Sequence, residues 1–200
     1  GIDDEAEEFP VSTGIALGDY DNDGDLDLAV TNFGLPSQLF RNDGRRSDGS
    51  FEFVEVSQEA GVDGVFRGGG VTFVDYDNDG DADLYIGRDG VDVMFRNRLM
   101  EDGTARFQDV TSALGLDVAP AGDADPRQRT VGVVFGDYDG DGRLDLYLST
   151  HISNLHDSPH MHQDRLYWNG GDRFVEVTNL LGGGQEATHV ASLAALWHDI

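Results

Sequence analysis

Short apolar runs alternate with polar, glycine-rich turns along the chain, and this pattern repeats. Each repeat begins with an apolar run that leads into an aspartate-rich loop, and a second apolar run leaves the loop. Two further short runs follow, separated by turns rich in Gly, Asp and Asn. Short runs bounded by such residues are typical of β-strands. No segment shows a helical period over about 11 residues, so we expect four short strands per repeat and an all-β fold.

Three copies of the repeat align at every expected strand. The first run is Gly14–Leu17 or Val131–Phe135; the second is Leu26–Thr31, Leu84–Gly87 or Leu144–Ser149; the third is Leu39–Asn42, Met94–Asn97 or Leu166–Asn169; the fourth is Phe53–Ser57, Phe107–Thr111 or Phe174–Thr178. Four strands per unit predict four-stranded antiparallel β-propeller blades. A β-sandwich with accidental internal similarity is the alternative, and three matched copies argue against it.

The loop between the first two runs has the pattern Asp-x-Asp-x-Asp-Gly-x-x-Asp in all three copies, starting at Asp19, Asp75 and Asp137. Four carboxylates within one short loop repel each other unless a cation lies between them. Ligand sets made only of oxygen suit Ca²⁺, whereas Mg²⁺ demands octahedral geometry and retains waters. An acidic turn without a metal is the alternative. We expect about three Ca²⁺ ions, one per loop.

These loops differ from the helix–loop–helix calcium site. That site needs a Glu at position 12 and flanking helices. Position 12 is here occupied by Val30, Ile86 and Leu148, and the flanks are strands. We therefore expect calcium to have a structural role, in which it neutralises the loop and fixes the first two strands of each blade.

The Asp loop, together with the Phe-x-(Glu/Asp)-Val-(Ser/Thr) strand, resembles the FG-GAP/VCBS-type repeat over roughly residues 11–200. This family occurs in integrin α-subunit propellers and in proteins similar to cartilage acidic protein. The resemblance implies a propeller, usually of seven blades. Carried over by position, it implies three ligand sets: Asp19, Asp21, Asp23, Asp25 through its carbonyl, and Asp27; Asp75, Asp77, Asp79, Asp81 through its carbonyl, and Asp83; Asp137, Asp139, Asp141, Arg143 through its carbonyl, and Asp145.

The repeats divide the chain into blades. The expected divisions are an acidic segment at 1–10, blades at 11–66, 67–129 and 130–189, and the start of a fourth blade at 190–200, where Asp199 would be the first ligand of a further loop. Three and a fraction blades cannot close a seven-bladed ring. We expect either a longer chain or several chains to complete it, and the end within a motif favours a longer chain.

The third unit has a longer connection between its second and third strands than the other two units. This insertion, 150–163, contains His151, His156, His160 and His162. Imidazoles suit zinc, copper or iron, so a transition metal site is one interpretation. A polar surface loop is the favoured one. The insertion should lie opposite the calcium loops, beside Arg67, Arg127, Arg129 and His189. In integrin-like propellers that face binds the ligand.

The composition narrows the choice of partners and compartment. The formal net charge is −26 and cysteine is absent, which argues against nucleic acid and anionic membranes and removes thiolate chemistry. No apolar stretch reaches the roughly 18 residues of a membrane helix, so we expect no membrane insertion. Calcium at millimolar concentration is extracellular, which favours an extracellular, cell-surface or periplasmic location.

No catalytic constellation is visible, so we do not expect an enzyme. The glycine runs Gly68–Gly70 and Gly182–Gly184 precede new units and are expected to be connectors. The leading hypothesis is a calcium-stabilised propeller that binds a protein or glycan, in adhesion or as a scaffold. There are two alternatives. One is a metal-dependent or redox protein that uses the His-rich insertion, and the other is a structural subunit of a larger complex.

Overall fold

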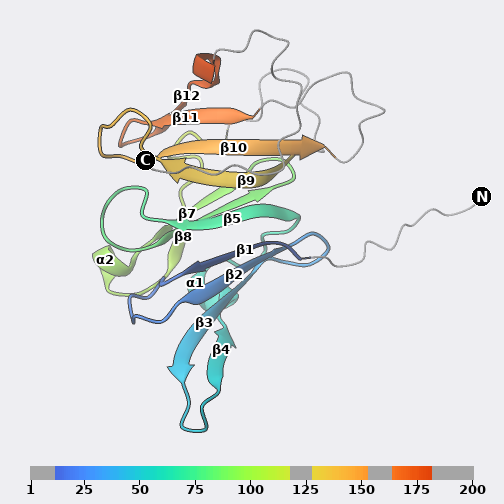
Figure 1. Ribbon diagram of the computed structural model, residues 1–200, viewed down its shortest axis with the longest axis vertical. Coiled ribbons are helices and arrows are strands. Elements are labelled where there is room, and N and C mark those ends of the chain that lie inside the picture. Colours follow the sequence, from blue (N-terminus) through green and yellow to red (C-terminus); the bar gives the residue numbers. More distant parts are fainter. Residues whose placement is uncertain (1–11, 118–127, 153–163, 182–200) are drawn as a thin grey trace, which may run out of the picture.

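Three four-stranded antiparallel sheets make up the described chain, one for each repeat (Figure 1). The computed structural model describes residues 12–117, 128–152 and 164–181. The strands are β1 (Ser12–Gly18), β2 (Asp27–Asn32), β3 (Gln38–Arg45) and β4 (Phe51–Glu55); β5 (Gly68–Val74), β6 (Asp83–Arg88), β7 (Val93–Asn97) and β8 (Phe107–Asp109); β9 (Gln128–Gly136), β10 (Asp145–Ile152), β11 (Arg165–Asn169) and β12 (Phe174–Glu176). Strands follow chain order within each sheet, as in propeller blades. The expected all-β fold of four-stranded antiparallel units is confirmed.

Helical structure is confined to single turns within the described ranges. These turns are α1 (Ser57–Ala60), α2 (Leu99–Asp102) and the 3-10 turn η1 (Thr178–Leu181). None of the helices in the described part is long or apolar enough to cross a membrane.

The second strand of the middle sheet, β6, is buried on both faces. Leu84 and Ile86 of β6 point toward the first sheet, and Tyr85 points toward the third, so successive side chains bury both faces. Alternation of side chains across a strand makes this possible. Two apolar clusters result, one on each side of the middle sheet.

The first strands of the three sheets lie side by side, with β5 between β1 and β9 (Figure 1). Gly68–Gly70 belong to β5 and are buried, so the expectation of a connector at these residues was wrong. A Cβ at Gly69 would collide with the main-chain oxygen of Thr130, and one at Gly14 would collide with that of Gly69. Glycine is required here because neighbouring first strands approach backbone to backbone. Gly182–Gly184 lie outside the described residues.

Buried asparagines fasten each blade to the one before it. Asn97, at the end of β7, donates from Nδ2 to the carbonyl of Tyr20 in the first blade at 2.7 Å and to that of Ala82 at 3.1 Å. Asn169 repeats the bond with the carbonyl of Tyr76 at 3.1 Å. Because Tyr20 is the second residue of an Asp loop, the loop of one blade is tied to the third strand of the next.

Asn97→Ala is expected to destabilise the chain more than Asn42→Ala does. Asn42 holds the same strand position, but its Nδ2 donates only within its own blade, to the carbonyl of Leu26 at 3.1 Å, among the hydrogen bonds of the described residues. Loss of the Asn97 side chain leaves the buried carbonyl of Tyr20 without its donor, which costs about 1–3 kcal/mol. Urea denaturation of both variants measures the difference. Equal losses would contradict a role for Asn97 in fastening two blades.

Candidate metal centre

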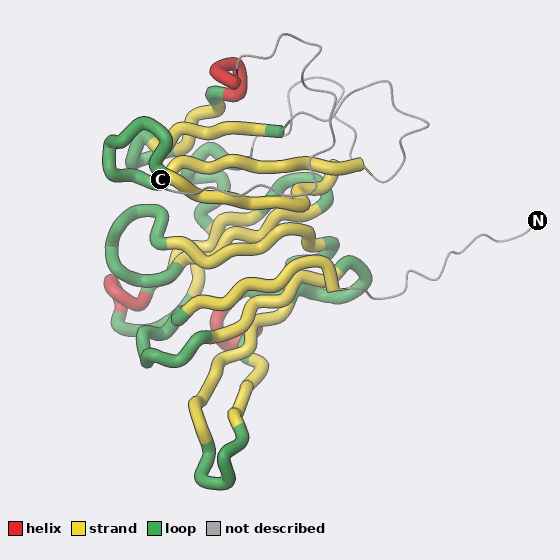
Figure 2. Tube along the Cα trace, viewed as in Figure 1, coloured by secondary structure: helices red, strands yellow, loops and turns green. Residues whose placement is uncertain are grey.

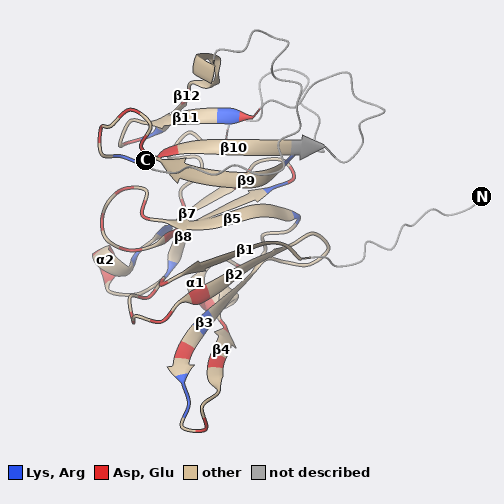
Figure 3. Cartoon of the chain, in the orientation of Figure 1, with Lys and Arg blue, Asp and Glu red and all other residues tan. Residues whose placement is uncertain are grey.

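The three Asp loops lie along one edge of the stacked sheets, at the left of Figure 2. Each loop joins the first two strands of its blade, namely β1 to β2, β5 to β6 and β9 to β10. Since the first two strands run in the same directions in each blade, the loops that connect them lie at the same edge of the stack. Figure 3 shows acidic residues in red along these loops.

The structure brings three of the expected carboxylates of each loop together. Their ligand oxygens lie within 4.8 Å of one another. The groups are Asp19, Asp21 and Asp27; Asp75, Asp77 and Asp83; Asp137, Asp139 and Asp145. These are positions 1, 3 and 9 of the sequence pattern, and the same three positions converge in all three blades.

The position 9 aspartate is buried and fixed through both oxygens. Asp27 accepts a hydrogen bond from the N–H of Tyr20 at 2.9 Å on Oδ2 and one from the N–H of Asn42 at 2.8 Å on Oδ1. The same contacts join Asp83 to Tyr76 and Asn97, and Asp145 to Tyr138 and Asn169. Each of these carboxylates therefore ties its loop to the start of the second strand and the end of the third.

The position 1 aspartate shapes the loop by accepting its amides. Asp19 accepts hydrogen bonds from the N–H groups of Asp23 at 3.1 Å and Gly24 at 3.0 Å. Gly24 has φ of 94° and Asn22 has φ of 58°, values that glycine and asparagine tolerate best. Asn22 also donates to the carbonyl of Gly80 in the next loop at 3.3 Å. The loops are therefore ordered by their own polar contacts.

The position 3 aspartate supplies the strongest sign that a cation fits. Oδ1 of Asp21 and Oδ1 of Asp77 are buried and have no hydrogen-bond partner. A buried carboxylate oxygen without a donor is costly. A hard cation in each of these two loops, among the converging oxygens, would satisfy the oxygen of that loop. The donor set therefore fits Ca²⁺, which takes oxygen ligands in flexible geometry.

Burial raises the pKa values of carboxyl groups in the first two loops. Desolvation is the main cause in each case, and neighbouring carboxylates add to it. The pKa is raised to about 6 for Asp27 and Asp77, and to about 8 for Asp83. A bound cation would oppose these shifts because it favours the ionised form.

Positions 5 and 7 are placed differently from positions 1, 3 and 9. Asp23 and Asp141 lie outside the converging groups and instead accept the N–H of position 7, at 2.8 Å from Asp25 and 2.9 Å from Arg143. Asp79 accepts the N–H of Asp81 in the same way. Ligation by the position 5 carboxylates, Asp23, Asp79 and Asp141, and through the position 7 carbonyl, at Asp25, Asp81 and Arg143, stays a prediction.

Sequence reasoning missed the third-strand residue that faces position 3. Arg96 of β7 contacts Asp77 at 2.7 Å in the second blade, and Trp168 of β11 donates from Nε1 to Asp139 at 3.0 Å in the third. Arg41 holds this position in the first blade. The alignment of the repeats could have identified this position, because the residue before the third-strand asparagine is Arg41, Arg96 or Trp168.

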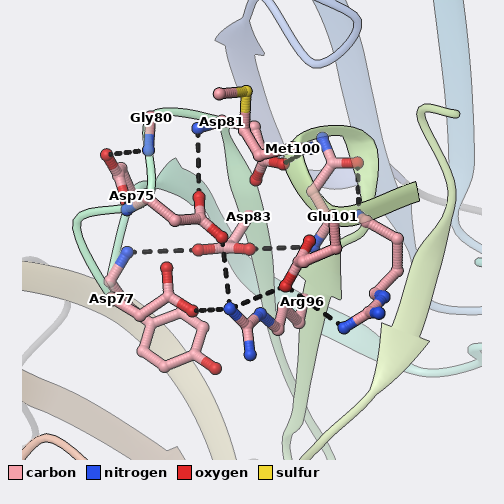
Figure 4. Close-up of polar contacts among 12 residues, drawn as sticks. Asp75, Asp77, Gly80, Asp81, Asp83, Arg96, Met100 and Glu101 are labelled. Carbon is pink, nitrogen blue, oxygen red and sulfur yellow. Dashed lines mark hydrogen bonds and ion pairs between the residues drawn. The ribbon is translucent and has the colours of Figure 1, made fainter. Parts of the chain in front are cut away.

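Glu101 was also missed, because it lies in α2 between the third and fourth strands and outside the repeated segments. Figure 4 shows Arg96 between Asp77 and Glu101, which it contacts at 2.7 Å each. Arg96 also contacts Asp79 at 3.2 Å. The second loop therefore carries a polar network that the aligned motif does not reveal.

A charged cluster lies at the strand ends opposite the Asp loops. Asp89 pairs with Arg67 at 3.1 Å and with Arg129 at 2.8 Å. Both guanidinium groups lie over the ring of Phe33, at 4.9 and 4.1 Å from its centroid. The expected position of Arg67 and Arg129 beside each other, away from the Asp loops, agrees with this arrangement.

Most of the His-rich insertion, 153–163, lies outside the described residues. His156, His160 and His162 lie outside them, as do Arg127, His189 and Asp199. His151 belongs to β10, where its backbone pairs with that of Arg129. A transition metal at these histidines stays a prediction.

The geometry of the Asp loops agrees with comparisons to known proteins. Residues 19–86 and 75–148 match the FG-GAP-like repeat. The chain is similar to cartilage acidic protein 1 from Xenopus tropicalis, with 27% identity over 150 residues, 74% of this chain and 22% of the relative. Cartilage acidic protein 1 from Homo sapiens is 28% identical over 150 residues, 74% of this chain and 21% of that protein.

This chain therefore spans about a fifth of the length of these relatives. The match to this family of repeats agrees with the expectation that the chain is not an enzyme. The two family matches together span residues 19–148, more than half of the 200 residues. The chain belongs to the family of FG-GAP-like repeat proteins.

Proposed function

We propose that this chain is the calcium-stabilised part of an extracellular β-propeller that binds a protein or glycan, as an adhesion or scaffold module. The observation that supports it most is the convergence of three carboxylates in each of three loops. Two of these loops leave a buried carboxylate oxygen without a donor. A cation at each loop would remove both the repulsion and the unmet oxygen.

Calcium suits these loops better than a transition metal or magnesium. The converging ligand atoms are all carboxylate oxygens, whereas imidazole and thiolate are the ligands that select zinc or copper. Position 1 and position 9 carboxylates also accept main-chain amides, so the loop, and not the ion, sets the orientation of these oxygens. Calcium tolerates such imposed geometry, and magnesium does not.

The first blade has an exposed aromatic side chain on the face that a preceding blade would cover. This exposure supports the proposal of a larger propeller. Phe53 is 47% exposed, whereas its equivalents Phe107 and Phe174 are 7% and 2% exposed. Phe107 stacks on Tyr20 of the preceding blade at 5.8 Å, and Phe174 lies 6.2 Å from Tyr76. A further blade that presents an aromatic residue from its own loop would cover Phe53. We expect further blades to complete the ring, with seven as the family number.

A partner would bind opposite the calcium loops. There the connection between β2 and β3 and the segment before β5 border a cavity of about 590 Å³. Leu35 and Phe66 line it and are exposed, and Glu55 and Asp63 add negative charge. A cavity with an apolar rim and polar groups is suited to a protein side chain or a glycan.

Removal of calcium is expected to lower the melting temperature, and added calcium should restore it. A site held at 100 times its dissociation constant contributes about 2.7 kcal/mol. In a chain of this size, 1 kcal/mol corresponds to about 2–4 °C, so each ion should contribute about 5–10 °C. Differential scanning calorimetry with EGTA and with excess calcium measures the shift.

Asp77→Asn and Asp43→Asn provide the matched variants for this experiment. Asp77 is one of the converging ligands, whereas Asp43 is exposed and pairs with Arg41 at 2.6 Å. Asp77→Asn should reduce the gain from calcium by the contribution of one ion, and Asp43→Asn should not. A melting temperature that changes with neither EGTA nor calcium would rule out structural calcium.

The gain in melting temperature from calcium is expected to grow as the pH rises. The folded pKa of Asp27 is about 6 and that of Asp83 about 8, above the unfolded value of 3.8. Below these folded values the native chain holds the extra protons, so without calcium its stability falls as the pH rises from about 4 to about 8. Calcium displaces the same protons and binds more tightly toward pH 8.

Melting curves at pH values of about 5, 6.5 and 8, with and without calcium, test this dependence. Asp92 is also buried with a raised pKa, but it lies away from the loops and contributes equally to both curves. Their difference therefore isolates the loop carboxylates. A gain that stays constant over this range would show that protons do not compete with the ion.

Phe66→Ser is expected to weaken binding of an extracellular protein or glycan. Phe66 lines the cavity, whereas Leu181→Ser changes a side chain of η1 with nearly the same exposure and serves as the control. Arrays of extracellular proteins and glycans, probed with both variants in calcium, compare their binding. Equal binding by Phe66→Ser and the parent chain would exclude this cavity as the partner site.

A further inference from the structure

We propose that the second blade binds a second calcium ion, held by Asp79, Asp81 and Glu101. This inference deepens the proposed function and rests on it, since it adds an ion beside the expected one in the same loop. Asp79 and Asp81 come from the loop between β5 and β6, and Glu101 comes from α2. One oxygen of each lies within 4.8 Å of the others. The converging carboxylates of the first site, Asp75, Asp77 and Asp83, form a separate group, and the Asp81 side chain is distinct from the main-chain carbonyl that is predicted to ligate the first ion.

Asp81 provides an observation that is independent of the clustering. Its side chain is almost fully buried, with 1% exposure for the residue. Oδ2 accepts the N–H of Met100 at 2.9 Å, which fixes the orientation of the carboxylate (Figure 4). Oδ1 is buried and has no hydrogen-bond partner. A buried carboxylate oxygen is satisfied by a donor or by a cation, and its neighbours in the cluster are carboxylates.

The third blade shows what this position requires. Arg143 occupies the place of Asp81, and its guanidinium forms an ion pair with Asp141, the counterpart of Asp79. The protein thus supplies its own cation between positions 5 and 7 of the third loop. In the second loop both positions carry carboxylates, and Glu101 adds another. Arg96 contacts Asp79 and Glu101 but leaves Oδ1 of Asp81 without a partner. A calcium ion beside that oxygen would balance Asp81 as the Arg143 guanidinium balances Asp141 in the third blade.

The charges near the second loop leave room for two calcium ions. Five aspartates and Glu101 face Arg96 and Arg98, which contact Glu101 at 2.7 and 3.1 Å. Asp102 also pairs with Arg98, so one divalent ion would leave the group strongly negative and a second would bring it close to neutral. Arg96 also contacts Asp79, so it repels the second ion and weakens its binding. We expect the second ion to bind more weakly than the ion of the first site.

Counting bound calcium tests the second site. Equilibrium dialysis of the full chain, followed by elemental analysis, gives the number of ions per chain. Glu101→Gln should bind one ion fewer than the parent chain. Asp102→Asn is the matched control, because Asp102 is the neighbouring acid of α2, is exposed and, within the described part of the chain, forms ion pairs only with Arg98. It should bind the same number of ions as the parent.

Two further variants keep the test decisive. Asp81→Asn should also lose one ion, and retention of the far-ultraviolet circular dichroism spectrum shows that the blade still folds. Arg96→Gln removes the repelling charge and should tighten the second ion without changing the count. An ion gained only in Arg96→Gln would show that Arg96 is the resident cation and would overturn the proposal.

The outcomes separate this proposal from the one on which it rests. If the parent and Glu101→Gln bind the same non-zero number of ions, the second site is wrong and the loop sites stand. If the parent binds no calcium, the proposed function itself fails.

Discussion

A buried aspartate at the end of each loop is the interaction on which the rest of the structure depends. Asp27 and its two equivalents accept one amide from their own loop and one from the third strand. This double contact fixes the loop relative to the sheet and leaves the carboxylate with little exposure. A charge so buried is costly unless it is paired. The convergence of two more aspartates on the same point raises this cost and calls for a cation.

The same loops also join neighbouring blades, so the metal centre and the blade interface form one system. Asn97 and Asn169 bond to the carbonyl of the tyrosine that follows the first loop aspartate, and the rings of these tyrosines pack on the next blade. An ion that orders a loop therefore also orders the contact surface offered to the following sheet. In repeat architectures, stability comes from such nearest-neighbour contacts.

The blades share one plan but differ in how each supports its loop. The position 3 aspartate contacts Arg96 in the second blade and Trp168 in the third. Position 7 is Asp81 in the second blade and Arg143 in the third. These differences change the local charge without changing the backbone path. The three loops are therefore expected to bind calcium with different affinities, although their aspartate patterns look alike.

The sequence by itself determined the strand order, the three loops and the carboxylates at positions 1, 3 and 9, because strand periodicity and ligand spacing are local properties of the chain. Tertiary structure alone decided that Gly68–Gly70 lie within a strand, since the need for glycine comes from the backbones of β1 and β9. It also decided the approach of Glu101 to Asp81, which depends on how α2 folds back over the loop. Contacts between residues far apart in sequence leave no periodic signal, and the second candidate ion site rests on such a contact.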